Sequence, residues 1–310
     1  MSQVLPRTGR GAGMLWVVLG AVALVASVWV VSRWAAAGNL HLEFRDAAVT
    51  PAREVMTWAV QAVLAVGAVG VAVIASRGCR RTGSVTLDTA LAIGFALSFW
   101  QDQILNYAAA TARYSHYAVH APGLGPYLPG WHGPAPDRLI MTVLGSSGLA
   151  WFAIMVLIWP LTSVVTRINR RWPTWGTGRL FIACLVSGLA MAFISEEAMI
   201  FVGGLYSWTG AIRSLSIFGG HWYQLPITEL VSFSVFLSLP AMMLYGQRVR
   251  GVTPHIFRGL ERSGTPAANW TRLLAGIGYG NLLAFGYLAF NAFIGYIGDP
   301  APSDLPSYLR

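Results

Sequence analysis

Long apolar segments alternate with short polar connections along the whole chain. Each of these segments comes close to the roughly 20 residues that an α-helix needs to cross the hydrocarbon core of a bilayer. We expect seven spans: Met14–Ser32, Val55–Ser76, Leu87–Ala112, Leu139–Thr166, Leu180–Leu205, Ile227–Tyr245 and Leu273–Ile297. The pattern predicts an all-α fold, a polytopic integral membrane helical bundle of about seven transmembrane helices in one domain over residues 1–310.

Two connections differ from the rest. The stretch Tyr206–Tyr223 is moderately apolar but is interrupted by glycines, so we expect an interfacial or re-entrant segment there rather than an eighth span. The connection 113–138 is dense in Tyr, His, Pro, Gly and Trp and carries few charges. Such a loop is stiff and aromatic, as a cover over a hydrophobic ligand would be.

The composition indicates that lipid, and not water, surrounds most of the chain. Only 11% of the residues are charged and 55% are hydrophobic, whereas a soluble domain carries about 25% charged residues. The net charge of +9 comes from arginines in short clusters between apolar segments. A nucleic-acid surface would need a continuous basic stripe, so we expect no nucleic-acid partner. The expected partner is the lipid bilayer, specifically a bacterial cytoplasmic membrane that the chain crosses several times.

The positive charges also predict an orientation. Fourteen arginines lie on the connections of one side and seven on those of the other. Cytoplasmic connections of membrane proteins carry the excess of positive charge, which predicts a cytoplasmic N-terminus and an external C-terminus. The chain contains no lysine, which excludes a retinal or pyridoxal Schiff base and a phosphate-loop lysine.

Four carboxyl side chains lie within the expected spans: Asp102, Glu196, Glu197 and Glu229. Ionisable groups are costly inside a membrane and usually face a cavity that has a function. A rise of 1.5 Å per residue puts Asp102 roughly 22 Å, and Glu196 roughly 24 Å, above the inner starts of their helices. Glu229 stands near the outer start of its span. We therefore expect these acids to converge beneath the loop 113–138.

The surroundings of Asp102 are polar and aromatic. On an α-helix, Asp102 would share a face with Phe99 and Asn106, flanked by Trp100 and Tyr107. Such a group could bind an oxygenated substrate and deliver a proton, or it could be a polar clamp between helices.

Two of the four acids, Glu196 and Glu197, are adjacent in the sequence. Glu196 and Glu197 diverge by about 100°, so at most one is expected to face a cavity. An acid buried among apolar groups can keep its proton and act as a general acid.

The histidines give a weaker signal. His116 and His120 have the spacing of two metal ligands on one helix face, but Pro122 soon ends any helix. We expect hydrogen bonding or loop packing for this pair. The cysteines Cys79 and Cys184 have no metal-ligand spacing, so neither structural zinc nor a disulfide framework is expected. His132 and His221 each adjoin a tryptophan and could line a pocket on the outer side.

Two regions resemble a known family. The run FWQDQILNYAAATARYSHY, followed by YLPGWHGP, is similar to the signature of AveC-like spirocyclases. A later arrangement, Glu196 or Glu197 followed by HWYQLPITE, resembles the second characteristic region of that family. The similarity covers roughly residues 99–229 and follows the order of the expected spans.

The resemblance implies cyclisation of a lipophilic dihydroxy-ketone polyketide to a spiroketal, with dehydration in some members. Such a reaction needs an acid, a base, stabilisation of a cation and exclusion of water, but no redox cofactor or metal. Asp102 is the expected acid/base and Glu196 its partner, with Glu197 and Glu229 as further catalytic candidates. The expected substrate-binding residues are Trp100, Asn106, Tyr107, Tyr114, His116, Trp131, His221 and Tyr223.

Other functions use similar groups. A membrane terpene-type cyclase would use the same acids to protonate an alkene or epoxide. A prenyltransferase would need a magnesium-binding acidic motif, which the sequence does not contain. A small-molecule transporter or sensor would show broken helices in corresponding halves and an internal repeat.

Overall fold

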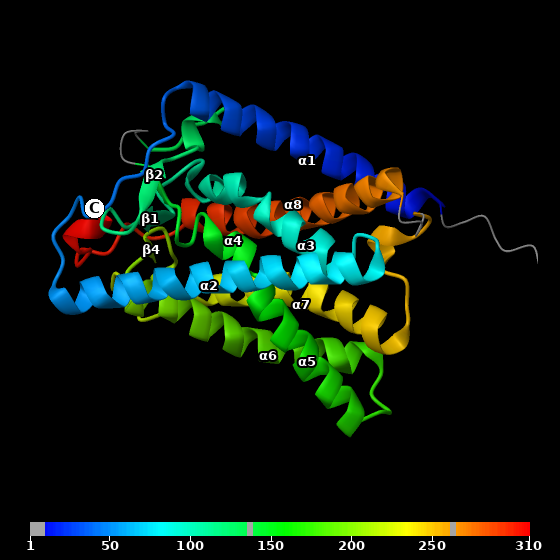
Figure 1. Cartoon of the computed structure of the whole chain (residues 1–310). Helices are drawn as coiled ribbons and strands as arrows, with labels where there is room; N and C mark the ends of the chain where they lie inside the picture. The colour runs from blue at the N-terminus through cyan, green and yellow to red at the C-terminus, as the bar shows by residue number, and fades with distance from the viewer. Residues whose placement is uncertain (1–9, 135–138, 261–264) are drawn as a thin grey trace, which may run out of the picture.

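The computed structural model describes residues 10–134, 139–260 and 265–310. Among these residues, six helices are long and apolar enough to cross a bilayer: Gly11–Ala36, Pro51–Thr82, Leu149–Arg171, Thr177–Val202, Ile227–Arg250 and Pro266–Tyr296. The long helices run along a common direction, and α1 begins at the end of the bundle away from the C-terminus (Figure 1). The prediction of a helical bundle with long apolar helices is confirmed.

The helices are α1 (Arg10–Ala36), α2 (Pro51–Thr82), α3 (Leu87–Ala96), α4 (Leu149–Ala153), α5 (Met155–Arg171), α6 (Thr177–Glu197), α7 (Ile227–Arg250) and α8 (Pro266–Tyr296). Short helical turns are η1 (Phe99–Asn106), η2 (Gly125–Tyr127), η4 (Ala198–Val202), η5 (Arg213–Leu215), η6 (His255–Phe257) and η7 (Ser307–Leu309). Together these elements account for most of the described chain.

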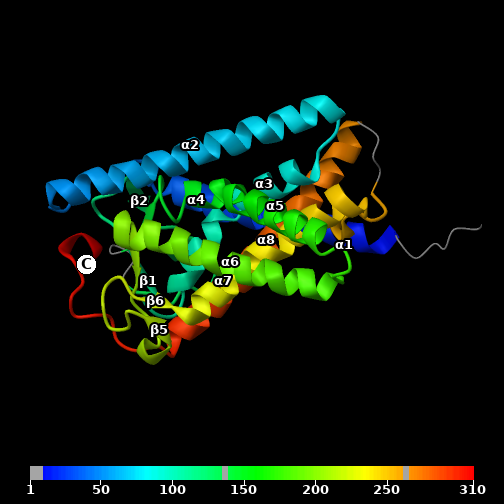
Figure 2. The ribbon, with the colours of Figure 1, turned by 90° about the horizontal axis from the view of Figure 1, so that it is seen from below.

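The described part of the chain has three small antiparallel sheets of two strands each, of which the first pairs segments far apart in the chain. They join β1 (Ala112–Tyr114) to β4 (Tyr206–Trp208), β2 (His120–Pro122) to β3 (Ile140–Thr142), and β5 (Ser216–Ile217) to β6 (Leu225–Pro226). The strands gather at the end of the bundle where the C-terminus lies (Figures 1 and 2). We call the connections at this end the cap: residues 37–50, 107–134, 139–148, 203–226 and 297–310.

The outer faces of the long helices are apolar. Val25 on α1 and Val66 on α2 are 69% and 72% exposed. Faces of this kind are unfavourable in water and suit contact with lipid chains. The helices also approach one another closely, which small residues permit in membrane proteins. A side chain at Gly94 of α3 would meet the backbone of Gly276 on α8, and one at Gly278 would meet the backbone of Trp16 on α1.

The third expected span, Leu87–Ala112, is not one helix. The α-helix α3 ends at Ala96, and the chain continues as the 3-10 helix η1 and then as strand β1. Gln101, Asp102 and Gln103 are all buried in η1. Irregular backbone is tolerated at membrane depth only where protein surrounds it. The apolar character of this segment therefore reports burial inside the bundle and not one continuous spanning helix.

The fourth expected span, Leu139–Thr166, also begins later than predicted. Its first residues form β3 and a turn, and the helical part starts at Leu149. Pairing of β3 with β2 draws these residues into the cap, which explains the difference. In the stretch Tyr206–Tyr223, which was predicted to be interfacial or re-entrant, the structure has short strands and turns instead of a long helix.

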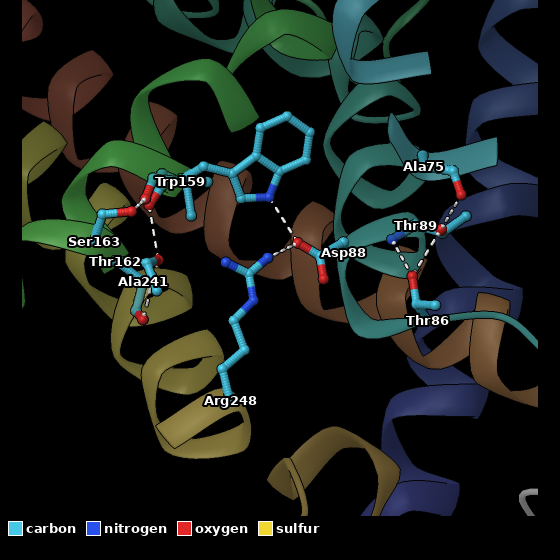
Figure 3. Close-up of polar contacts among 10 residues, drawn as sticks. Ala75, Thr86, Asp88, Thr89, Trp159, Thr162, Ser163, Ala241 and Arg248 are labelled. Carbon is cyan, nitrogen blue, oxygen red and sulfur yellow. Dashed lines mark hydrogen bonds and ion pairs between the residues drawn. The ribbon is translucent and has the colours of Figure 1, made fainter. Parts of the chain in front are cut away.

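Polar contacts fix the beginning of α3 at the end of the bundle opposite to the cap (Figure 3). Asp88 accepts hydrogen bonds from the indole N–H of Trp159, at 2.6 Å, and from the guanidinium of Arg248. Thr86 caps α3, while the hydroxyl of Thr89 donates to the carbonyl of Ala75 on α2 at 3.1 Å. These contacts tie α3 to α2, α5 and α7, so the start of the segment that leads to Asp102 is fixed.

Candidate active site

A cavity of about 520 Å³ lies among the helices, next to the cap. Residues of α2, α4, α5 and α6 form most of its wall, and η1, β1, η4, β4, α7 and α8 also contribute to it. The wall is mainly apolar, with a small number of polar side chains that converge on the space. Ligand sites of small molecules usually have this character. The polar and aromatic part consists of Asp102, Tyr114, Ser146, Trp151, Ser195, Glu196, Tyr206, Trp208, Phe233, Phe236 and Tyr287.

Two carboxyl groups in this wall have matching partners. Asp102 accepts a hydrogen bond of 2.5 Å from the Tyr114 hydroxyl and one of 3.3 Å from the Trp151 indole N–H. Glu196 accepts from the hydroxyl of Tyr206 and, at 3.4 Å, from the indole N–H of Trp208. Each acid is therefore held by one phenol and one indole while it faces an apolar space.

The β1–β4 sheet explains this matched arrangement. Tyr114 and Tyr206 are direct partners in the sheet, and their ring centroids are 6.4 Å apart. Side chains of opposed residues project on the same face of a sheet, and so do residues two apart in one strand. Tyr114, Tyr206 and Trp208 therefore all point into the cavity, two toward Glu196 and one toward Asp102.

Asp102 lies in η1 and is buried. A carboxyl group buried among apolar groups can keep its proton and act as a general acid. Burial and the nearby Asp102 raise the pKa of the Tyr114 hydroxyl, in β1 of the cap, well above its ordinary value. Tyr114 therefore remains a hydrogen-bond donor.

Glu229 lies directly behind the cavity wall. It is fully buried, and one carboxyl oxygen accepts a hydrogen bond of 2.9 Å from the hydroxyl of Tyr287, which lines the cavity. The other oxygen has no hydrogen-bond partner among the described residues. The three acids expected to converge thus lie together, two in the wall and one behind it. Glu197 is half-buried and does not line the cavity, in keeping with its divergence from Glu196.

Several other residues from the sequence analysis hold the cap together. Asn106 is buried and accepts a hydrogen bond from the backbone N–H of Ala112, so it shapes the turn before β1 instead of sharing a helical face with Asp102. The Tyr107 hydroxyl donates to the carbonyl of Pro129 at 2.8 Å, and its ring packs edge-on against Trp131. Trp100 packs in an apolar cluster with α1.

The remaining aromatic candidates lie elsewhere in the cap. His116 packs edge-on against His120. His221 stacks on Tyr223 with ring centroids 5.3 Å apart, and its Nδ1 lies 3.1 Å from Asp304. The structure thus brings Asp102, Glu196 and Tyr114 into the cavity wall, but not Trp100, Asn106, Tyr107, His116, Trp131, His221 or Tyr223.

Four phenol or indole side chains of the cavity wall were not among the predicted site residues: Trp151, Tyr206, Trp208 and Tyr287. A signal existed for two of them, since Tyr206 and Trp208 alternate with Ser207, the period of a strand with one aromatic face. Tyr287 is a phenol within an apolar span, and a buried phenol needs a hydrogen-bond partner. Trp151 carries no such signal, because only the folded chain brings it to Asp102.

The cavity extends to the outer surface of the bundle. Val63 of α2 and Ile194 of α6 both line it, yet they are 70% and 67% exposed. Val156 of α5 combines the same two properties. The opening between α2, α5 and α6 is therefore framed by apolar side chains, which suits passage of a lipophilic molecule from the surrounding lipid.

Comparison with known proteins agrees with the resemblance noted in the sequence. The family model described as "Spirocyclase AveC-like" matches residues 79–308, from the last turn of α2 to η7. Neither the curated proteins nor the solved structures gave a match. The matched region contains both carboxyl groups of the cavity wall together with their phenol and indole partners, and it covers most of the chain. The chain therefore belongs to the AveC-like spirocyclase family.

Proposed function

We propose that the protein is a membrane-bound spirocyclase that closes a lipophilic dihydroxy-ketone, of polyketide type, into a spiroketal. Membership of the family supports a cyclase role. The observation that carries the proposal is the pair of carboxyl groups in one apolar cavity, each held by a phenol and an indole. Such a pair can give and take protons in a space from which water is excluded.

The reaction needs four proton transfers: the enzyme gives two protons to the ketone oxygen and takes one proton from each of the two hydroxyl groups. In the first step, protonated Asp102 donates to the ketone oxygen while the Glu196 carboxylate takes the proton of the attacking hydroxyl, and a hemiketal forms. In the second step, Glu196 returns its proton to the former ketone oxygen, which leaves as water. The second hydroxyl then adds to the oxocarbenium ion and its proton passes to Asp102. One water is released, and both acids return to their starting states.

The partners of the acids have defined roles in this sequence. Tyr114 and Tyr206 donate hydrogen bonds to the carboxyl groups and thereby orient them and stabilise their charged forms. Trp151, Trp208 and Tyr287 line the same space, and their rings can attract the oxocarbenium ion through cation–π interaction. No step requires a redox cofactor or a metal ion.

The direct test uses purified protein in proteoliposomes and synthetic dihydroxy-ketones of increasing chain length. We expect conversion to a product lighter by one water, with one spiroketal diastereomer in excess over the uncatalysed mixture. A product ratio equal to that of empty liposomes, at every chain length, would contradict a spirocyclase.

The pH dependence of the reaction follows from both acids. Because Asp102 must be protonated and Glu196 ionised when the reaction begins, we expect kcat/KM to be bell-shaped, with a rising limb from Glu196 and a descending limb from Asp102. Removing the Tyr114 hydroxyl removes a hydrogen bond that favours the Asp102 carboxylate. The variant Tyr114→Phe should therefore shift the descending limb to higher pH. A pH–rate profile measured on both proteins checks this, and a shift to lower pH would contradict the assignment.

We also propose that the chain crosses a bacterial cytoplasmic membrane seven times, with the N-terminus inside. The third crossing is made by α3 and η1 together, and the excess of arginine at the end opposite to the cap supports this orientation. One introduced, exposed cysteine tests the topology in a Cys79→Ser background, in which the remaining Cys184 is buried. Ser115 is buried and unsuitable, whereas Ala48 and Thr174 are exposed at opposite ends of the bundle.

We expect Ala48→Cys to react with an impermeant maleimide added to intact cells, because residue 48 belongs to the cap. Thr174→Cys lies between α5 and α6 and should react only after the cells are permeabilised. The reverse pattern would invert the orientation, and reaction of both positions in intact cells would contradict seven crossings.

The opening between α2, α5 and α6 is proposed as the route by which substrate reaches the cavity from lipid. A bulky side chain at Val63 would narrow it, so Val63→Trp should lower kcat/KM about tenfold, mainly through KM. The control is Val66→Trp, since Val66 is equally exposed on α2 but does not line the cavity. Kinetics in proteoliposomes check the prediction, and equal effects of the two variants would exclude this route.

A further inference from the structure

A second group of polar side chains lies in the cap, apart from the cavity. The connection between α1 and α2 is paired with the region around β2 through backbone hydrogen bonds. Glu43 and His120 exchange two such bonds of 2.9 Å, and the Asp46 N–H donates to the His116 carbonyl at 3.1 Å. This pairing places the carboxyl groups of Glu43 and Asp46 at the imidazole of His120 and holds them there.

The surroundings of the buried His120 side chain determine which of its ring nitrogens carries the proton. Its side chain is only 1% exposed, and Nδ1 lies 2.9 Å from the carbonyl oxygen of Ala118. Because a carbonyl can only accept a hydrogen bond, Nδ1 carries the proton, and Nε2 of the neutral ring has a free lone pair. Among the described residues Nε2 has no hydrogen-bond partner.

The lone pair of Nε2 faces two carboxyl groups. Nε2 is 3.0 Å from Oδ2 of Asp46 and 3.4 Å from Oε2 of Glu43. A lone pair so close to two carboxylate oxygens is repelled by them unless a positive charge lies between. Either a second proton on His120 or a bound cation supplies that charge.

The distances agree with a bound cation. Ligands that each lie about 2.1 Å from a tetrahedral zinc ion are roughly 3.4 Å from one another. The ligand atoms of Glu43, Asp46 and His120 all lie within 4.8 Å of one another. The Ala118 carbonyl fixes the tautomer and orientation of the ring, as second-shell contacts do in metal sites. One imidazole nitrogen with two carboxylate oxygens suits a divalent transition metal better than Ca²⁺ or Mg²⁺.

We propose that Glu43, Asp46 and His120 bind a divalent transition-metal ion of the Zn²⁺ class. The ion would clamp the connection between α1 and α2 to β2 and so stabilise the cap. The site is not implied by the family, because Glu43 and Asp46 precede residue 79, where the family match begins. It also differs from the His116–His120 pair considered in the sequence, since its carboxyl ligands come from a distant segment.

The test is titration of ZnCl₂ into the full-length protein in detergent, after treatment with a chelator, followed by calorimetry and elemental analysis. We expect one equivalent of Zn²⁺, a higher melting temperature with metal, and weaker binding of CaCl₂. Asp46→Asn and Glu43→Gln should each lower Zn²⁺ affinity about tenfold or more. Both side chains are roughly half exposed, so the helical core is undisturbed.

The matched control is Asp304→Asn, which alters another carboxyl–histidine pair of the cap, with Asp304 3.1 Å from His221. This variant should bind Zn²⁺ like the wild type. Absence of Zn²⁺ binding by the wild type, or unchanged binding by both ligand variants, would overturn the proposal in favour of an ion pair with protonated His120. Equal affinity for Ca²⁺ would overturn the transition-metal assignment.

Discussion

Replacing Asp102 with asparagine is expected to abolish cyclisation while the protein remains folded. Loss of a general acid typically lowers the rate by about 10²–10⁴-fold, and we expect kcat of Asp102→Asn to fall within this range. The asparagine has nearly the same size, and its single oxygen can still accept the hydrogen bond that Tyr114 donates, while its amide group replaces the oxygen that accepts from Trp151. The proton that the ketone oxygen needs is lost, while the shape of the cavity is retained.

Turnover measured on the purified variant in proteoliposomes checks this expectation. Circular dichroism and the elution volume in detergent show whether the bundle is intact. Asp88→Asn is a suitable control, because Asp88 is also a hydrogen-bonded acid (Figure 3) but does not line the cavity. Turnover of a folded Asp102→Asn protein at the wild-type rate would remove Asp102 from the mechanism.

The second large effect is expected from Glu196→Gln. Glu196 takes the proton of the first hydroxyl and returns it to the leaving water, so a glutamine would block both steps. We expect a fall in kcat of about 10²–10⁴-fold, as for Asp102. The variant Glu197→Gln provides a matched control in the adjacent position, since Glu197 does not line the cavity. Its turnover should stay within severalfold of the wild type.

The double variant distinguishes a cooperating pair from two independent acids. Residues that act as a unit have strongly non-additive effects on catalysis. The combination of Asp102→Asn with Glu196→Gln should therefore be about as slow as the slower single variant. The measurement is kcat of the wild type, the two single variants and the double variant, which together form a double-mutant cycle. If the fold-reduction in the double variant equals the product of the two single fold-reductions, the two acids act independently.

The sequence alone predicted the class of the fold, because lipid imposes a simple rule on length and apolarity. The helices α1, α2, α6, α7 and α8 follow that rule, and their existence was predicted. The segment after Leu87 did not follow it, since its residues are shielded by protein and can leave the α-helix. The apolar residues that follow Leu139 likewise do not begin a helix, because β3 pairs with β2 in the cap. No local sequence pattern indicates this pairing.

The candidate site was partly predictable for a similar reason. Acids inside apolar segments are rare, so Asp102 and Glu196 could be selected, and the depth estimate brought them to one level. The depth of Asp102 was estimated for one continuous third helix. Although the segment is α3 followed by η1, it still leads from one end of the bundle toward the other, so Asp102 lies far from the start of α3. Tyr114 and Tyr206 meet only through the β1–β4 sheet, so their pairing with the acids depends on the fold.

Several aromatic residues in the family motifs were predicted to bind substrate but lie outside the cavity wall. Tyr107 and Trp131 pack against each other in the cap, and His221 stacks on Tyr223 away from the cavity. Their positions indicate that the conspicuous motifs of the sequence build the cap above the site. The polar groups of the cavity wall come instead from strands and helices whose local sequence is less conspicuous.

Formation of a spiroketal from an acyclic dihydroxy-ketone can be tested in the native host of the protein. Mass spectrometry of lipophilic metabolites would compare cells with and without the gene. We expect that deletion removes a cyclic product and accumulates an acyclic compound heavier by one water, and that a plasmid copy, but not the Asp102→Asn variant, restores the product. Accumulation of an isomer of unchanged mass would contradict spiroketal formation and favour a terpene-type cyclase, and an unchanged metabolite profile would contradict a biosynthetic role.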